Sequence, residues 1–211
     1  MPCNCQRPVR EHADIPVPVA LHELRHRYAN ELAATLASLQ IARARGDGDR
    51  LIDEAIGRIE AQAKLARFLI EPHGPRFQVV DGVLNIGALL IRSRHSGPAV
   101  HIRVKTAPVS LDKQEAAEFL PVINELLVNA LKHVREGIIY VTVKERGNRL
   151  ILAVRNNAET ATMPAEGEGQ GVAILRRYLR HKRASLTVRA RNGEYSAIVA
   201  WPLSARDGNR H

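Results

Sequence analysis

The sequence has few aromatic residues, only two cysteines and no long apolar segment. Phe, Trp and Tyr make up 4% of its 211 residues, so the core must consist mainly of aliphatic side chains. Cys3 and Cys5 form an isolated C-x-C pair, which is a weak metal signal and is more typical of a tail with reduced thiols. No apolar run reaches the roughly 18–20 residues that a membrane-spanning helix needs. Residues 1–18 also lack the apolar segment of a secretory signal, so we expect a cytoplasmic protein without membrane insertion.

The chain is strongly basic, with a formal net charge of +9 and a pI near 10.1. A charge of this sign often indicates nucleic-acid binding. Here the 31 Lys and Arg residues are scattered rather than gathered in a run, and few rings are present to stack on bases. The sequence therefore favours a solvated basic surface, or one that suits an acidic protein partner, over a nucleic-acid-binding surface.

The first part of the chain predicts a helix behind a disordered tail. Residues 1–18 contain four prolines, and we expect them to be disordered. A helix is predicted from about Val19 to Arg45, because its larger apolar residues share an arc of about 120°. The Gly-Asp-Gly-Asp sequence at 46–49 predicts a tight turn after this helix.

A second helix is predicted from this turn to about Ile70, which completes a helical hairpin over 19–71. Its predicted apolar face consists of Ile52, Ala55, Ile56, Ile59, Ala63, Ala66 and Ile70. Two helices alone bury too little apolar surface to be stable, so these faces need a partner. A homodimer whose hairpins form a four-helix bundle is the simplest solution.

Residues 71–75, Glu-Pro-His-Gly-Pro, predict a linker, after which helices and strands alternate. We expect helices near 82–94, over 113–135 and up to about His181, and strands near 100–105, 138–144, 150–155, 185–190 and 195–201. The predicted fold class is α+β. The helical hairpin precedes an α/β sandwich domain over 78–203, and 204–211 form a tail.

Glu23, His26 and Asn30 share one face of the first predicted helix, away from its apolar stripe. An exposed imidazole can act as a nucleophile towards phosphorus, and Glu23 could orient the ring or accept its proton. A surface histidine near a surface glutamate is also a common accident. The spacing alone therefore leaves both interpretations open.

In the predicted helix at 113–135, Glu125, Asn129 and Lys132 stand at i, i+4 and i+7 and so share a face. Oxygen ligands beside a cation suit a magnesium-bound nucleotide phosphate. The alternative is an ordinary solvated helix face. Further along, Gly167, Gly169 and Gly171 precede a predicted helix, where backbone amides can approach phosphate. Such a G-x-G-x-G is a weak signal by itself.

Taken in order, these segments resemble the conserved boxes of two-component sensor histidine kinases. Residues 23–32, Glu-Leu-Arg-His-Arg-Tyr-Ala-Asn-Glu-Leu, are similar to the phosphoacceptor box of the HWE-related kinases, in which arginine follows the histidine. The resemblance covers about residues 19–203 and implies that His26 is the phosphoacceptor. The sequence lacks the W-x-E of the strict HWE kinases, so the resemblance is to the broader histidine kinase superfamily, with a relation to the HWE group.

Residues 124–133 are similar to the N-box of the same superfamily. The resemblance implies a GHKL-type (Bergerat) domain that binds ATP with Mg²⁺. In it Asn129 would bind the metal, Lys132 would contact phosphate, Glu125 would have a polar or general-base role, and His133 would complete the box. The glycine box at the ATP lid would be formed by Gly167, Gly169 and Gly171, and the last hairpin by the strand pair that ends near Trp201.

One box departs from the family pattern. The family sequence D-x-G-x-G contains an aspartate that accepts a hydrogen bond from the adenine amino group. Here Asn156 replaces that aspartate and Ala158 replaces the first glycine. An asparagine carbonyl can accept the same hydrogen bond without a charge. The departure therefore bears on ATP affinity more than on the fold.

Three functions follow from this resemblance. The favoured one is a histidine kinase that phosphorylates His26 from ATP and passes the group to an aspartate of a response regulator receiver domain. Its signal could then come from a separate sensor protein. The second is a histidine phosphotransferase whose degenerate ATPase-like domain does not bind ATP. The third, a serine kinase of the anti-sigma type, fits poorly with the histidine box in the hairpin.

Overall fold

The computed structural model describes residues 37, 39–41, 48–71, 73–94, 99–132, 134, 136–157, 170–191 and 194–204. Residue 37 and residues 39–41 are helical, which agrees with the helix predicted over 19–45. The rest of that helix, the tail 1–18 and nearly all of the tail 204–211 lie outside the described residues.

Helix α2 (Gly48–Ile70) confirms the second predicted helix and ends where the sequence predicted. The turn predicted over 46–49 is partly wrong, because Gly48 and Asp49 already belong to the helix.

Within the described residues, the centre of the second domain is a five-stranded sheet in the order β2-β4-β5-β7-β6. Strands β2 and β4 are parallel, and the other neighbouring pairs are antiparallel. The strands are β2 (Val100–Thr106), β4 (Gly137–Glu145), β5 (Arg149–Asn157), β6 (Ser185–Arg191) and β7 (Glu194–Pro202). All five were predicted. The sequence did not predict the two-residue pair β1 (Phe77–Gln78) and β3 (Ser110–Leu111).

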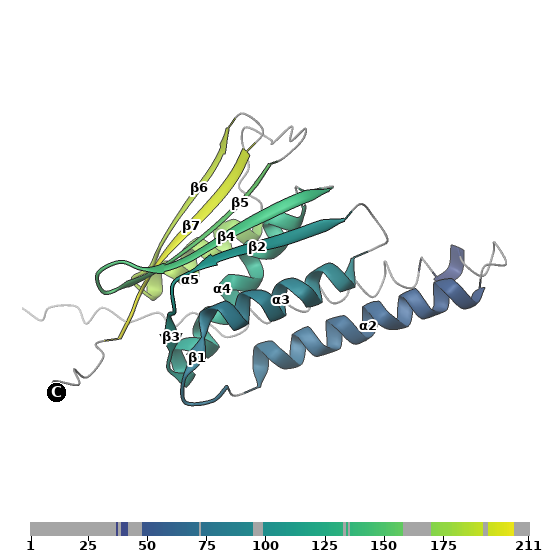
Figure 1. Cartoon of the computed structure of the whole chain (residues 1–211), viewed down its shortest axis with the longest axis horizontal. Coiled ribbons are helices and arrows are strands. Elements are labelled where there is room, and N and C mark those ends of the chain that lie inside the picture. The colour runs from purple at the N-terminus through teal and green to yellow at the C-terminus, as the bar shows by residue number, and fades with distance from the viewer. Residues whose placement is uncertain are drawn as a thin grey trace, which may run out of the picture.

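Helices α3 (Val79–Ser93), α4 (Lys113–Lys132) and α5 (Gln170–His181) lie on the same side of the sheet (Figure 1). Helix α4 is the most deeply buried of them, and its residues Phe119, Ile123 and Leu127 pack in the core against the inward side chains of the strands. The predicted helix over 113–135 extended too far. Helix α4 ends at Lys132, and Val134 is buried with its carbonyl oxygen accepting a hydrogen bond from Arg94 (3.0 Å).

Helix α2 has two apolar faces, of which the sequence identified one. Leu65, Phe68 and Leu69 pack against the core of the second domain. The predicted face lies about 130° around the helix. Of that face, only Ala55 is buried, whereas large side chains remain exposed at Ile52, Ile56, Ile59 and Ile70. The described part of the chain contains no helix that is long and apolar enough to cross a membrane.

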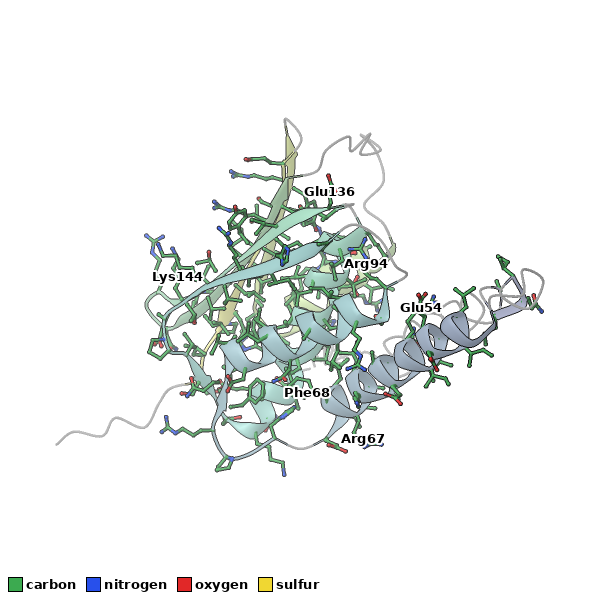
Figure 2. All side chains as sticks on the ribbon, turned by 45° about the vertical axis from the view of Figure 1, so that its right-hand side comes forward. Glu54, Arg67, Phe68, Arg94, Glu136 and Lys144 are labelled. Atoms are coloured by element: carbon green, nitrogen blue, oxygen red, sulfur yellow. The ribbon has the colours of Figure 1, made fainter. Side chains whose placement is uncertain are left out.

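A cluster of three rings joins α2 to the second domain. His73 lies between Phe68 of α2 and Phe77 of β1, with ring centroids 4.9 and 4.6 Å away. Its Nε2 donates a hydrogen bond to the carbonyl oxygen of Phe68 (3.0 Å). Figure 2 marks Phe68 at the end of α2 that lies against the domain. The linker predicted at 71–75 is thus packed onto the domain at His73.

Candidate functional site

Three polar side chains are buried on α4, in a helix that is otherwise apolar on its inner side. Asn124, Glu125 and Asn129 are 8–9% exposed. Burying polar groups costs free energy unless they find partners, so such a group on a core helix indicates either a structural network or a binding site. Asn124 Oδ1 has no hydrogen-bond partner among the described residues.

Glu125 and Asn129 lie one helical turn apart and are hydrogen-bonded to each other. Asn129 Nδ2 donates to Glu125 Oε1 over 3.1 Å. In this bond the Asn129 amide uses its nitrogen. Its oxygen, the atom that would bind a metal ion, takes no part in the bond. The spacing predicted from the sequence therefore places a carboxylate and an amide oxygen side by side, and both are ligands that Mg²⁺ accepts.

Asn156 faces this helix from the end of β5. Its side chain is 1% exposed, and its Nδ2 donates to the carbonyl oxygen of Ala130 over 3.0 Å. Because α4 ends at Lys132, this carbonyl belongs to the last turn, where backbone acceptors lack partners within the helix. Asn156 Oδ1 is left buried with no partner among the described residues, so it can accept a hydrogen bond from a ligand.

Tyr195 is a member of the site that the sequence did not identify. It is opposite Asn156 in the β5–β7 register and is 3% exposed. Burial, and secondarily the nearby carboxylate of Glu125, raise the pKa of Tyr195 to about 12. The alternation of inward and outward residues along β7 was the available signal, but it does not reveal which helix residue the ring approaches.

Contacts of Tyr178 and Lys182 join α5 and the residue after it to α4. The Tyr178 hydroxyl donates to the carbonyl oxygen of Glu118 over 2.8 Å, and Lys182 Nζ lies 2.7 Å from the Glu118 carboxylate. Tyr178 also lies over Trp201, with ring centroids 6.4 Å apart. This packing fixes the direction of α5, whose first turn contains Gly171.

Most of the other predicted site residues are not among those that the structure describes. Lys132 is exposed in the last turn of α4, on the same helix as Glu125 and Asn129. Glu23, His26, His133, Gly167 and Gly169 lie outside the described residues. The structure therefore brings together Glu125, Asn129 and Asn156, with Tyr195 added.

This set of residues fits a magnesium nucleotide. The orphaned Asn156 Oδ1 provides a buried acceptor for an amino group, and the Glu125–Asn129 pair provides hard oxygen atoms. Mg²⁺ commonly binds through one or two protein oxygens together with the phosphates of its nucleotide. A buried hydrogen-bond acceptor and a pair of hard oxygen atoms are therefore present on adjacent elements.

Solved structures share this fold. A bacterial phosphotransferase matches with a TM-score of 0.58 and 14% identity, over 85% of this chain and 92% of its own. The blue-light activated histidine kinase of Erythrobacter litoralis matches with a TM-score of 0.51 and 20% identity, over 91% of this chain and 65% of its own.

No protein-family model and no curated protein sequence matches the chain. At the identities of the structural matches, similarity establishes the fold alone. The resemblance to HWE-related kinases rests on the sequence of residues 23–32 and stays a prediction. The five-stranded sheet with its helices confirms the α+β part of the predicted fold class, and the chain shares its fold with the matched phosphotransferase and the blue-light activated histidine kinase.

Proposed function

We propose that this protein is a histidine kinase that phosphorylates His26 from ATP and transfers the group to an aspartate of a response regulator receiver domain. The observation that carries the proposal is the buried, unpartnered Oδ1 of Asn156 beside the Glu125–Asn129 pair. An acceptor for adenine and an oxygen ligand for magnesium would have no reason to adjoin each other in a purely structural core.

In this proposal each residue of the second domain has a distinct role. Asn156 accepts a hydrogen bond from the adenine amino group, and Asn129 contributes its amide oxygen to Mg²⁺. Glu125 fixes the Asn129 amide through the 3.1 Å hydrogen bond. Lys132, exposed at the helix end, neutralises phosphate charge, together with His133 and the backbone amides at Gly167, Gly169 and Gly171. Bound ATP supplies the γ-phosphoryl group.

The phosphoacceptor role of His26 rests on the sequence. Its imidazole would attack phosphorus as a nucleophile, and Glu23, one turn before it, would orient the ring or accept its proton. The protein then contributes mainly positioning and charge neutralisation, as is usual in phosphoryl transfer. Both residues belong to the proposed hairpin over 19–71, and we propose that the protein is cytoplasmic.

We further propose that the hairpin forms a homodimer. Ile52, Ile56 and Ile59 are 44%, 50% and 41% exposed and lie on one stripe of α2. Large apolar side chains that recur along one helix face are typical of a helix that packs against another helix. A four-helix bundle made from two hairpins would bury this stripe.

A second function is favoured by one specific observation. The hydrogen bond from Asn156 Nδ2 to the Ala130 carbonyl oxygen is one that an ionised aspartate cannot make. It stabilises the domain whether or not a nucleotide binds. A domain that had lost ATP binding could retain this bond, and the protein would then be a histidine phosphotransferase that takes its phosphoryl group from a phosphorylated regulator.

The test is incubation with γ-labelled ATP and magnesium, for the wild type, His26→Ala and Asn129→Ala. We expect acid-labile, alkali-stable label on the wild type and none on His26→Ala. Calorimetry should show magnesium-dependent ATP binding that is retained by His26→Ala and lost in Asn129→Ala. If the wild type neither takes up label nor binds ATP, the phosphotransferase replaces the kinase. A phosphorylated receiver domain is then the donor to test.

A further inference from the structure

No described helix covers the second face of the sheet, opposite α3, α4 and α5 (Figure 1). Five residues form a row across this face, which we call the cross-strand row. Strand pairing places Arg103 opposite Tyr140, Tyr140 opposite Arg155, Arg155 opposite Ser196, and Ser196 opposite Arg189. Each strand of the sheet thus contributes one residue, and every second position of the row is an arginine.

A cavity of about 720 Å³ lies over this row. Lys105 and Thr142, the next outward pair along β2 and β4, also line it. Glu194 at the start of β7 is its acidic member. The charged side chains that line the cavity therefore comprise four cations and one carboxylate. Asn156 and Tyr195 also line the cavity, but their side chains are directed to the other side of the sheet, towards α4.

The cations of the cavity have no ion-pair or side-chain hydrogen-bond partners among the described residues. Arg103, Lys105, Arg155 and Arg189 are exposed, and none of them forms an ion pair or side-chain hydrogen bond within the described part of the chain. Neighbouring strands are about 4.8 Å apart, so successive arginines of the row are separated by about 10 Å. Gathering like charges in this way stabilises nothing in the fold itself, and an anionic ligand would relieve their repulsion.

We propose that the cross-strand row binds a phosphorylated anion of nucleotide size, at a site separate from the one on α4. Guanidinium groups bind phosphate oxygens through two parallel hydrogen bonds, and Ser196 and Thr142 add hydroxyl donors. Tyr140 is 44% exposed between Arg103 and Arg155, where its ring offers a surface for a base.

The volume and lining of the cavity favour a small ligand over a macromolecule. Its volume falls within the range of roughly 300–1,000 Å³ that is usual for small-molecule sites. A specific protein partner would need about 800 Å² of complementary surface on this chain. A single-stranded nucleic acid would need a series of stacking rings, and Tyr140 is the one exposed aromatic side chain of the cavity.

The experiment measures binding of two probes to the full chain by calorimetry, without magnesium and at moderate salt. The probes are inorganic tripolyphosphate and the dinucleotide pApA. We expect both to bind the wild type. Arg103→Gln combined with Arg155→Gln should weaken both by about ten-fold or more, since the charge-assisted hydrogen bonds from two guanidinium groups to phosphate are lost. Arg177→Gln combined with Arg180→Gln removes the same charge from exposed positions of α5 and should have little effect.

Two further variants separate the sources of the phosphate and the two sites. Tyr140→Ala should weaken pApA but leave tripolyphosphate unchanged if the natural ligand carries a base. Equal binding of both probes to this variant and to the wild type would assign the site to a base-free phosphorylated compound. Asn129→Ala should bind both probes normally. The proposal is overturned if neither probe binds, if the α5 control weakens binding equally, or if Asn129→Ala abolishes it.

Discussion

Asn156 combines two roles that an aspartate at this position could not combine. Its Nδ2 satisfies the Ala130 carbonyl oxygen in the last turn of α4, and its Oδ1 stays available in the site. The side chain is thus held in one orientation from the helix side, with its acceptor atom preorganised. An uncharged acceptor also avoids the large cost of burying a carboxylate without a cation.

Replacing Asn156 by Asp should therefore destabilise the ligand-free protein by about 1–3 kcal/mol near pH 8, because a donor is lost and a charge is buried. Burial beside a carbonyl raises the pKa of the new carboxyl above its unfolded value of about 3.9. The folded state then binds the extra proton, so the loss of stability should shrink as the pH falls towards 4. Urea unfolding at both pH values measures this.

Asn148→Asp is the matched control, since Asn148 Nδ2 also donates to a backbone carbonyl, that of Leu203, over 3.0 Å. Asn148 is exposed, so its carboxylate would remain in water and its effect should change little with pH. Equal pH dependence in the two variants would contradict the burial argument.

The raised pKa of Tyr195 leads to a prediction about stability at alkaline pH. Its pKa of about 12 exceeds the ordinary value of 10.0, because burial and then Glu125 disfavour the phenolate. Between these values the unfolded chain loses the proton first, so the stability due to this hydroxyl is present below pH 10 and is lost as the pH rises towards 12. In Tyr195→Phe the denaturant midpoint should fall less over this interval than in the wild type. Parallel curves for the two proteins would remove Tyr195 from the interior of the site.

At the scale of single residues, the sequence identified those site residues that lie close together within one helix or strand. Glu125 and Asn129 were found because they stand one turn apart on a helix. Asn156 was found through the resemblance of its box. Tyr195 was missed as a site residue because its approach to Glu125 depends on the packing of β7 against α4, which no local pattern contains.

The start of α4 shows how an element holds the site residues in place. Asp112 Oδ1 accepts from the Glu115 backbone N–H (2.8 Å), and Glu115 Oε2 accepts from the Asp112 backbone N–H (3.2 Å). This reciprocal pair is a capping box. Glu115 Oε1 also accepts from the Ser204 backbone N–H (2.7 Å), which ties the chain after β7 to the same turn.

Asp112→Ala should lower the free energy of unfolding by about 0.5–2 kcal/mol, because the first turn of α4 loses its cap. Asp112→Asn can still accept the hydrogen bond and should recover most of the loss. Thermal or urea unfolding of the three proteins checks this. A loss as large in the Asn variant as in the Ala variant would show that the charge, rather than the cap, stabilises the helix.

Element boundaries were predictable where a local signal marks them, and were misplaced where packing decides. The end of α2 at Ile70 precedes the segment Glu-Pro-His-Gly-Pro, whose prolines and glycine signal a break. The end of α4 came three residues earlier than predicted, at Lys132 instead of 135. There the chain leaves the helix so that Val134 is buried and its carbonyl oxygen meets Arg94. No helix-breaking residue in the sequence marks that point.

At the scale of the whole molecule, the exposed stripe on α2 predicts the oligomeric state. If Ile52, Ile56 and Ile59 form the dimer contact, Ile56→Glu should convert the protein to a monomer without unfolding the second domain. Size-exclusion chromatography with light scattering measures the mass, and circular dichroism checks the fold. Leu84→Glu on α3 is the matched control, since Leu84 is also 50% exposed but lies outside the stripe. Dissociation by the control as well would place the contact elsewhere.

The ring cluster of Phe68, His73 and Phe77 secures the C-terminal end of α2, while its other end extends away from the sheet (Figure 1). The helix spans 23 residues, or about 34 Å at 1.5 Å per residue. A rotation about its C-terminal end would therefore displace its N-terminal end the most. A tilt of about 10° about the C-terminal end would displace Gly48 by about 6 Å, which is more than one helical turn. A rotation of α2 about its C-terminal end would thus be felt most at the end of the helix that continues into the predicted hairpin.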